Sequence, residues 1–324
     1  MRVLITGITG MVGSHLAEYI LDNHLSVEVH GLIRWRSPLD NIRDILSKIT
    51  LHQGDLRDLN SLVLLLRNVK PDWIFHLAAQ SYVTSSFDAP AETIHTNVIG
   101  TVNLLDAVRI TEIDPKIHVC SSSEVYGQVR EDKIPIRETN PFRPASPYAV
   151  SKVGEDMIAL QYFLSYGLKT VRTRMFTHTG PRRGDVFAES AFAKQIAEIE
   201  AGLRPNPMKV GNLDSVRTFA DVRDAVRAYW LLLEKCPPGE VYNIGGNRTM
   251  TVGEMLEILK SMARCKTEHE VDPVLLRPSD VTLQIPDTSK FRAATGWEPE
   301  IPMEVTLQDL LEYHRNRIQN GRSL

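Results

Sequence analysis

The sequence predicts an α/β fold: a doubly wound parallel sheet followed by a smaller C-terminal α/β lobe. Three observations lead to this prediction. A short apolar run at the N-terminus ends in three regularly spaced glycines, apolar runs then alternate with helical stretches as far as Arg174, and the alternation stops beyond that residue. Strands that alternate with helices are typical of a parallel sheet covered on both faces.

The expected elements of the first half follow one another closely. Residues 3–6 form an apolar run closed by Gly7, and residues 11–21 carry apolar side chains at helical spacing. Further helices are expected near 60–68, 91–110 and 148–166, and further strands at 27–33, 49–52, 73–77, 116–121 and 170–174. This order predicts a Rossmann-type sheet.

The pattern changes after Arg174. A loop rich in Gly, Pro and Arg spans residues 179–184, a helix is expected near 187–202, and a short run follows at 208–212. Residues 240–245 have the pattern of a strand that returns to the sheet. We therefore expect two units: a sheet domain of residues 1–174 with about 217–245, and a smaller lobe of residues 175–216 and 246–324.

The composition is that of a globular protein with a large core, since 43% of the 324 residues are hydrophobic and 24% are charged. A net charge of −3 without basic runs argues against nucleic acid or a membrane surface as a partner. Three widely spaced cysteines, Cys120, Cys236 and Cys265, indicate reduced thiols in a cytoplasmic protein and no metal site. No apolar run is long enough to span a bilayer, and no signal peptide opens the chain.

The three glycines lie where a strand passes into a helix. In that position glycines let the backbone approach a dinucleotide pyrophosphate, and the helix N-terminus supplies N–H groups. Their spacing of three and three differs from the fingerprint of many dehydrogenases, and a tight turn without a ligand is the alternative. The expected cofactor-binding residues are Gly7, Thr9, Gly10, Met11, Val12, Gly13, Arg34, Arg36, Asp55, Leu56, Leu77, Ala78, Ala79, Tyr148, Lys152 and His178.

The end of the second strand indicates which dinucleotide is bound. An acidic residue there would hold the adenosine ribose hydroxyls of NAD, but this chain has Arg34 and Arg36 and no carboxylate. Two guanidinium groups favour a 2′-phosphate, so the predicted cofactor is NADP. The alternative is that both arginines only decorate an exposed loop.

Tyr148 and Lys152 are the first candidates for catalysis. Four residues apart on a helix, they share one face, where the ammonium lowers the pKa of the phenol. A tyrosine so placed can move protons while a nicotinamide moves hydride. Such a pair also occurs on ordinary surface helices. The preceding glycine turn and the hydroxyl-rich run Ser122–Glu124 favour the catalytic interpretation.

These landmarks together resemble the extended short-chain dehydrogenase/reductase family, and the resemblance covers essentially the whole chain. Within that family the chain is similar to nucleotide-sugar enzymes, above all the GDP-mannose 4,6-dehydratases. The similar stretches are Leu51–Asp58, Ala79–Phe87, Ser122–Gly127, Pro181–Gly184, Gly211–Asp214 with Arg217, and Arg277–Asp280.

The resemblance implies roles for four catalytic residues. Tyr148 is the acid–base residue, Lys152 binds the nicotinamide ribose and tunes Tyr148, and Ser122 positions the sugar hydroxyl. Glu124 is the base for the C5 proton once C4 has been oxidised, unless it only orders the turn after the strand. The implied reaction converts GDP-mannose to GDP-4-keto-6-deoxymannose and regenerates NADP.

The substrate site is expected to include guanidinium groups, because their planar donor fork fits phosphate oxygens. Arg217 and Arg277 are the candidates for the diphosphate, although either is equally able to serve as a surface ion-pair partner. The full set of expected substrate-binding residues is Ser81, Ser122, Ser123, Glu124, Thr177, Arg183, Lys194, Arg217 and Arg277.

Some positions depart from the dehydratase pattern. Thr177 stands where the dehydratases usually carry an asparagine, and the stretches Phe192–Ile196 and Lys209–Leu213 are similar to GDP-4-keto-6-deoxymannose reductases. An NADPH-dependent reductase is therefore the main alternative. Another nucleotide-sugar dehydratase or epimerase ranks below it. A non-catalytic NADP-sensing protein is a third, disfavoured because Tyr148 and Lys152 are both present.

The resemblance also implies self-association. Family members usually dimerise through the two helices expected near 91–110 and 148–166, so we expect a homodimer. The loop at 34–41 offers a second contact in a homotetramer.

Overall fold

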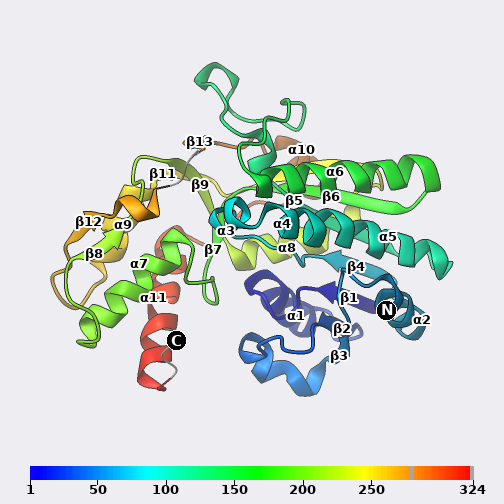
Figure 1. Cartoon of the computed structure of the whole chain (residues 1–324), viewed down its shortest axis with the longest axis horizontal. Coiled ribbons are helices and arrows are strands. Elements are labelled where there is room, and N and C mark those ends of the chain that lie inside the picture. Colours follow the sequence, from blue (N-terminus) through cyan, green and yellow to red (C-terminus); the bar gives the residue numbers. More distant parts are fainter. Residues whose placement is uncertain (277–280, 322–324) are drawn as a thin grey trace.

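A seven-stranded parallel sheet forms the centre of the larger part of the molecule (Figure 1). The computed structural model describes residues 1–276 and 281–321. The spatial order of the strands is β10-β6-β5-β4-β1-β2-β3. Their bounds are Arg2–Thr6 (β1), Glu28–Ile33 (β2), Thr50–Gln53 (β3), Trp73–His76 (β4), Lys116–Ser122 (β5), Lys169–Met175 (β6) and Val241–Ile244 (β10). The predicted doubly wound sheet is confirmed, and residues 241–244 do return to it.

Helices cover both faces of this sheet. On one side lie α1 (Met11–Asn23) and α8 (Val222–Lys235), and on the other α2 (Leu59–Val69), α5 (Gly100–Ile110) and α6 (Pro147–Tyr166). Strand β1 contributes side chains to the apolar cores on both faces of the sheet. Val3 and Ile5 pack with the first group of helices and Leu4 with the second. This follows from the alternation of side chains along a strand.

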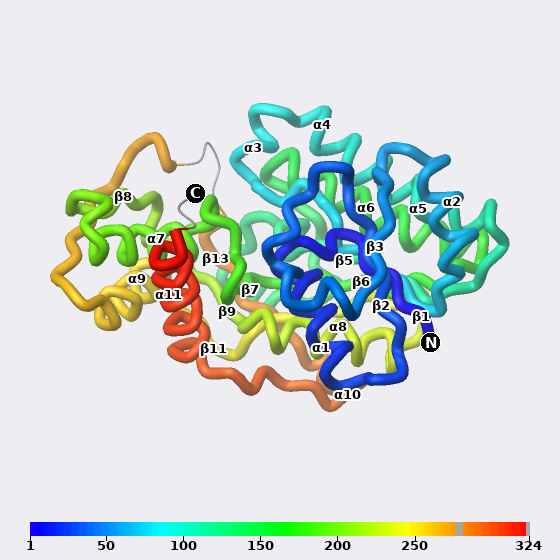
Figure 2. The backbone as a smooth tube through the Cα atoms, turned by 90° about the horizontal axis from the view of Figure 1, so that it is seen from below, coloured from blue at the N-terminus to red at the C-terminus, as the bar shows by residue number. Residues whose placement is uncertain are grey.

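The smaller part has its own apolar core. Helices α7 (Ala188–Glu200), α9 (Val252–Ser261) and α11 (Met303–Gln319) enclose it, and α7 and α11 lie side by side in both views (Figures 1 and 2). Two small sheets complete this part. They consist of β8 (Met208–Val210) with β12 (His269–Val271), and of β9 (Val216–Asp221) with β7 (His178–Thr179), β11 (Arg248–Thr251) and β13 (Leu283–Gln284).

Shorter helices connect these elements. The stretch expected as one helix at 91–110 is three segments, α4 (Pro90–Ile94), the π-helical turn η2 (His95–Ile99) and α5. The other short helices are η1 (Asp40–Lys48), α3 (Val83–Asp88), η3 (Ser123–Tyr126), η4 (Glu131–Lys133), η5 (Pro273–Leu275) and α10 (Ser289–Thr295).

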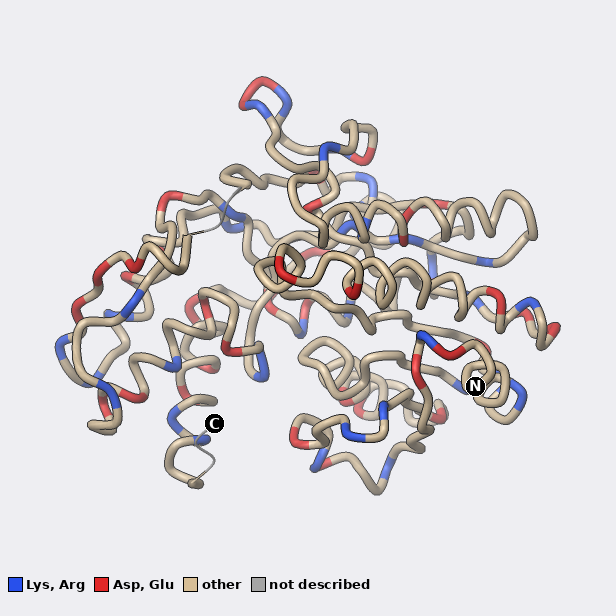
Figure 3. Tube along the Cα trace, viewed as in Figure 1, with Lys and Arg blue, Asp and Glu red and all other residues tan. Residues whose placement is uncertain are grey.

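Acidic and basic side chains are interspersed over both parts of the molecule (Figure 3). Within residues 1–276 and 281–321, no helix is both long and apolar enough to cross a bilayer. The same residues contain no cluster of His, Cys, Asp and Glu able to hold a metal ion.

Candidate active site

The glycine turn between β1 and α1 brings three backbone segments into close contact. Gly7 has φ +74°, and a Cβ there would lie 2.9 Å from Ala78 Cα. A Cβ on Gly13 would lie 2.3 Å from the Gly7 carbonyl oxygen. Both positions therefore require glycine. The first turn of α1 carries no acidic side chain, so its N–H groups can bind an anion.

One cavity of about 1100 Å³ begins at this turn and extends to the smaller lobe. It brings together nearly all the residues predicted from the sequence. Those that line it are Gly7, Thr9, Gly10, Met11, Val12, Gly13, Arg34, Asp55, Leu56, Leu77, Ala78, Ala79, Ser81, Ser122, Ser123, Glu124, Tyr148, Lys152, Thr177, His178, Arg183 and Arg217.

The structure leaves two predicted residues away from the cavity wall. The Arg36 guanidinium instead stacks on the Trp35 ring, 4.4 Å from its centroid. The Lys194 ammonium lies 3.2 Å from Asp185 Oδ2 and 3.8 Å from Glu198 Oε1. The predicted Arg277 lies outside the described residues.

Helix α6 positions the Tyr148 and Lys152 side chains. Ser146 caps it by accepting a hydrogen bond of 3.0 Å from the Ala149 N–H, and Pro147 occupies its first turn. The Tyr148 N–H donates to Ser86 Oγ at 3.1 Å, which fixes the start of the helix against α3. Lys152 Nζ lies 5.9 Å from the centroid of the Tyr148 ring. The two groups are thus neighbours on one helix face, as predicted.

The Tyr148 phenol is in an environment of opposing effects. Burial raises its pKa, whereas the Lys152 ammonium and a hydrogen bond with Ser122 act to lower it. The net direction is upward, because desolvation disfavours the phenolate. Tyr148 therefore rests as a phenol, with a cation and a hydroxyl in place to stabilise the anion.

The turn after β5 carries the second group of candidates. Ser122 caps η3, since its Oγ accepts from the Glu124 N–H at 3.2 Å, and this places the Glu124 side chain at the cavity, half-buried. Ser123 Oγ donates to Gln284 Oε1 at 2.7 Å. That bond joins this turn to β13, 161 residues later.

The cavity has a cationic end beyond β2 and β3. Arg34 lies on its wall, and its N–H donates to Ser37 Oγ at 3.0 Å. Asp55 Oδ2 accepts from Arg57 at 2.8 Å, and the hydrogen bonds from Arg57 hold the pKa of the Asp55 carboxyl below its usual range. Arg57 also lines the cavity and was not predicted.

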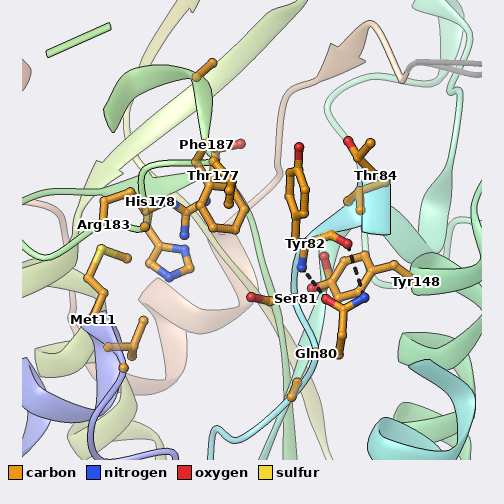
Figure 4. Close-up of a pocket in the computed structure, with 18 of the residues that line it drawn as sticks. Met11, Gln80, Ser81, Tyr82, Thr84, Tyr148, Thr177, His178, Arg183 and Phe187 are labelled. Atoms are coloured by element: carbon orange, nitrogen blue, oxygen red, sulfur yellow. Dashed lines mark hydrogen bonds between the residues drawn. The ribbon is translucent and has the colours of Figure 1, made fainter. Parts of the chain in front are cut away.

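The loop after β7 forms the opposite wall. Arg183 stacks on Phe187, with its guanidinium carbon 3.5 Å from the ring centroid, and its Nε lies 3.3 Å from Glu189 Oε1. Burial lowers the pKa of His178 to about 4, and the charge of Arg183 acts in the same direction. His178 is therefore neutral near pH 7. Figure 4 shows Met11, His178 and Arg183 on one side and Gln80, Tyr82 and Tyr148 on the other.

Buried Asn97 lies behind the cavity wall and holds a lining segment in place, which the sequence did not reveal. Its Oδ1 accepts from the Gln80 N–H at 2.8 Å, and its Nδ2 donates to the Gln80 carbonyl at 2.9 Å and to Ser151 Oγ at 2.8 Å. Asn97 lies in the π-helical turn η2, a feature common at functional sites. The asparagine clamps the loop after β4 onto α6. No local pattern distinguishes it from an exposed helical asparagine.

Comparison with known proteins gives one family. A family model described as GDP-mannose 4,6 dehydratase matches residues 4–310. The chain belongs to this family. It is 35% identical to a GDP-mannose 4,6-dehydratase of Yersinia enterocolitica, over 94% of this chain and 91% of that protein.

A second group of relatives carries another activity in its name. The chain is 33% identical to a GDP-6-deoxy-D-mannose reductase of Pseudomonas aeruginosa, over 98% of both proteins. A solved structure of RMD from the same organism, complexed with NADPH, superposes with a TM-score of 0.85 at 33% identity; the match covers 98% of this chain and 99% of that chain. The solved structures that are similar to this chain are extended short-chain dehydrogenase/reductase enzymes. The predicted resemblance to that family is therefore confirmed.

Proposed function

We propose that the chain is an NADP-dependent GDP-mannose 4,6-dehydratase. One observation carries the proposal: Glu124 and Tyr148 line the same cavity, which begins at the glycine turn. A 4,6-dehydration needs two proton-transfer groups, one at C4 and one at C5. The match to the family model over residues 4–310 and the similarity to named dehydratases support it.

The residues around the glycine turn fit a dinucleotide phosphate. Gly7 and Gly13 let the turn close tightly, where a Cβ would collide with backbone atoms, the N-terminus of α1 faces the cavity, and Arg34 lies on the cavity wall where a 2′-phosphate is expected. An NADP bound there would supply the hydride acceptor for oxidation at C4 and the hydride for reduction at C6.

Tyr148 acts first on the sugar. The Tyr148 phenol releases its proton to solvent once cofactor and sugar are bound, and the Lys152 ammonium stabilises the phenolate. The phenolate oxygen then takes the proton of the C4 hydroxyl, which Ser122 orients. The ketone that forms at C4 makes the C5 hydrogen acidic.

Glu124 then carries the elimination. Its carboxylate removes the C5 proton and donates a proton to the C6 oxygen, which leaves as water. Ser122 holds the C4 carbonyl, and Tyr148 donates the proton that it took from the C4 hydroxyl to C5 when C6 is reduced. Arg183 and Arg217, both on the cavity wall, bind the diphosphate. We assign the cofactor to residues 1–174 with about 217–245 and the nucleotide sugar to residues 175–216 and 246–324.

A turnover assay tests the proposal. With GDP-mannose in excess and only a catalytic amount of NADP, we expect complete conversion to a product lighter by one water, identified by mass. No conversion, or conversion limited to the amount of cofactor, contradicts it.

The second candidate is an NADPH-dependent GDP-4-keto-6-deoxymannose reductase. It is favoured by Thr177 on the cavity wall and by the reductase relative that matches 98% of both chains. In this reaction Tyr148 donates its proton to the C4 ketone and Glu124 is idle. Stoichiometric consumption of NADPH with the 4-keto sugar, together with inertness toward GDP-mannose, would identify the reductase.

We also propose that the protein is a homodimer through the stretch near 91–110 (α4, η2 and α5) and the helix near 148–166 (α6), with the loop at 34–41 adding a contact in a tetramer. Exposed apolar side chains on and next to these helices support this: Ile99, Ile110, Val150, Met157, Leu164 and Tyr166. A monomer by light scattering at micromolar concentration contradicts it. The three free thiols support a cytoplasmic location.

A further inference from the structure

Glu155 is a buried carboxylate that contacts the catalytic pair. It lies one helical turn beyond Lys152 on α6, and its Oε2 accepts a hydrogen bond of 2.8 Å from Lys152 Nζ. The side chains of Lys152 and Glu155 are 6% and 1% exposed. Glu155 Oε1 has no hydrogen-bond partner among the described residues. Among the described residues, Lys152 is thus the one hydrogen-bond partner of this carboxylate.

Stability does not account for this arrangement. Burying two charges costs several kcal/mol per ion, and the attraction between them offsets that cost only when the remaining lone pairs are satisfied. Here one carboxylate oxygen is unsatisfied. Lys152 Nζ has a second acceptor, the Cys120 carbonyl at 3.0 Å, so a neutral residue at 155 would leave the ammonium bonded. We therefore look for the reason for a carboxylate at position 155 in its negative charge.

We propose that Glu155 is a positioning residue that fixes the Lys152 ammonium and weakens its field at Tyr148, so that the free enzyme holds Tyr148 as a phenol. Without Glu155, an uncompensated cation would lie 5.9 Å from the centre of the Tyr148 ring. With it, the pair is close to neutral, and more of the stabilisation of the phenolate must come from Ser122 and the bound ligands.

The other ionisable groups near Lys152 are either paired with another residue or neutral, so Glu155 is the counter-ion of Lys152. On α6 itself, Asp156 is bonded to Arg172 and Arg174 of β6. Burial lowers the pKa values of His76 and His118 to about 3, so both histidines are neutral near pH 7. Burial raises the pKa values of Cys120 on β5 and Tyr229 on α8, and these two are also neutral.

More distant groups around α6 are paired or exposed. Arg183 of the facing loop is paired with Glu189, and Asp106 with Arg109 on α5. Glu124 and Tyr126 lie on η3, and Glu92 and His95 are exposed on α4 and η2. Burial raises the pKa of Glu155 above its usual range, and the charge of Glu155 adds to the rise in the pKa of Tyr148. Both directions agree with the geometry.

The test titrates Tyr148 directly by ultraviolet tyrosinate absorbance, because the inference rests on the catalytic pair of the proposed function. The step is assigned as the one lost in Tyr148→Phe. In Glu155→Gln, which keeps the size and the hydrogen bond, we expect its midpoint about one pH unit lower than in the parent. Glu155→Met, which introduces an apolar residue of similar volume, should shift the Tyr148 midpoint in the same direction. Whichever of the two variants folds is therefore sufficient for the test.

A matched control separates charge from stability. Glu200→Gln removes a half-buried carboxylate that pairs with an arginine, Arg315, in the other lobe. We expect it to lower the melting temperature and leave the Tyr148 midpoint unchanged. An unchanged or higher midpoint in the Glu155 variants overturns the inference. If the midpoint falls but GDP-mannose is not converted, the inference stands and the dehydratase proposal fails.

Discussion

Arg182 donates two hydrogen bonds, of 2.9 and 2.6 Å, to the carboxylate of Glu18 on α1. A second contact lies beside it, between His15 Nε2 and the Pro181 carbonyl oxygen at 3.1 Å. The loop that carries Arg183 to the cavity is thereby tied to the helix that begins at the glycine turn. The two ends of the site are mechanically connected.

This connection predicts the effect of Glu18→Gln. Glu18 does not line the cavity, so its loss acts only by releasing the loop. Because both partners are partly exposed, we expect a loss of about 1 kcal/mol, or roughly a fivefold rise in KM for GDP-mannose with little change in kcat. Asp22→Asn, at an exposed position on the same helix, is the control. Equal KM values in the two variants would show that the contact does not order the loop.

The two arginines after β2 should behave differently. Arg34 is on the cavity wall, whereas Arg36 stacks on Trp35. We expect Arg34→Gln to weaken NADP binding by about tenfold or more and NAD binding little, since a charge-assisted bond to phosphate is lost. Arg36→Gln should change neither. Calorimetric titration of both cofactors checks this, and equal losses for NADP and NAD in Arg34→Gln would contradict it.

Most of the fold and much of the site could be predicted because their signals are local. A few neighbouring residues are enough to specify several elements. Examples are the apolar run before Gly7, the helical spacing of apolar residues in α1, and the Ser146–Pro147 start of α6. Parallel strands then place their carboxyl ends at one edge of the sheet, which is why Ser122, Tyr148 and the glycine turn meet.

The remaining features depend on contacts between distant segments. Lys194 looks like a free cation in sequence, but its partners Asp185 and Glu198 are chosen by the fold. Asn97 and Glu155 look like ordinary helical polar residues, and only packing buries them. The sheet around β9 joins segments from residues 178 to 284, with two strands of only two residues, so no local period marks it.

Buried histidines predict acid instability. His118 donates or accepts at Thr173 Oγ1 at 2.8 Å, and burial lowers its pKa from 6.5 to about 3. A lowered pKa stabilises the fold above pH 6.5, and this stability is lost as the pH falls toward 3. When the pH falls from 6.5 to 5, one such histidine lowers the free energy of unfolding by about 2 kcal/mol.

The free energy of unfolding, measured with urea, should therefore fall between pH 7 and pH 5 in both the parent and His118→Gln. In His118→Gln this fall should be about 2 kcal/mol smaller than in the parent. Comparing variant with parent cancels the contribution of Glu155, which changes in the opposite direction. Exposed His95→Gln is the control and should follow the parent. A parallel pH dependence of His118→Gln and the parent would mean that His118 is already charged in the fold.

Glu124 decides between elimination and simple redox chemistry at the shared Tyr148–Lys152 site. Its backbone is fixed by Ser122 Oγ, so Glu124→Gln keeps the turn, the size of the side chain and most hydrogen bonds. What it removes is the base for C5. A general base typically contributes roughly 10²- to 10⁴-fold in rate, so kcat for GDP-mannose should fall within that range while cofactor binding persists.

Exchange at C5 gives the independent measurement. In deuterated water the parent should incorporate deuterium at C5, and Glu124→Gln should lose this exchange together with turnover. Glu131→Gln, at an exposed carboxylate on η4 that does not line the cavity, is the matched control and should retain exchange. If the Gln variant converts GDP-mannose at nearly the parental rate, Glu124 only orders the turn and another group is the base for C5. If instead the parent only reduces a 4-keto sugar with NADPH, the reductase activity is the function of this site, because Tyr148 alone suffices to protonate a C4 ketone.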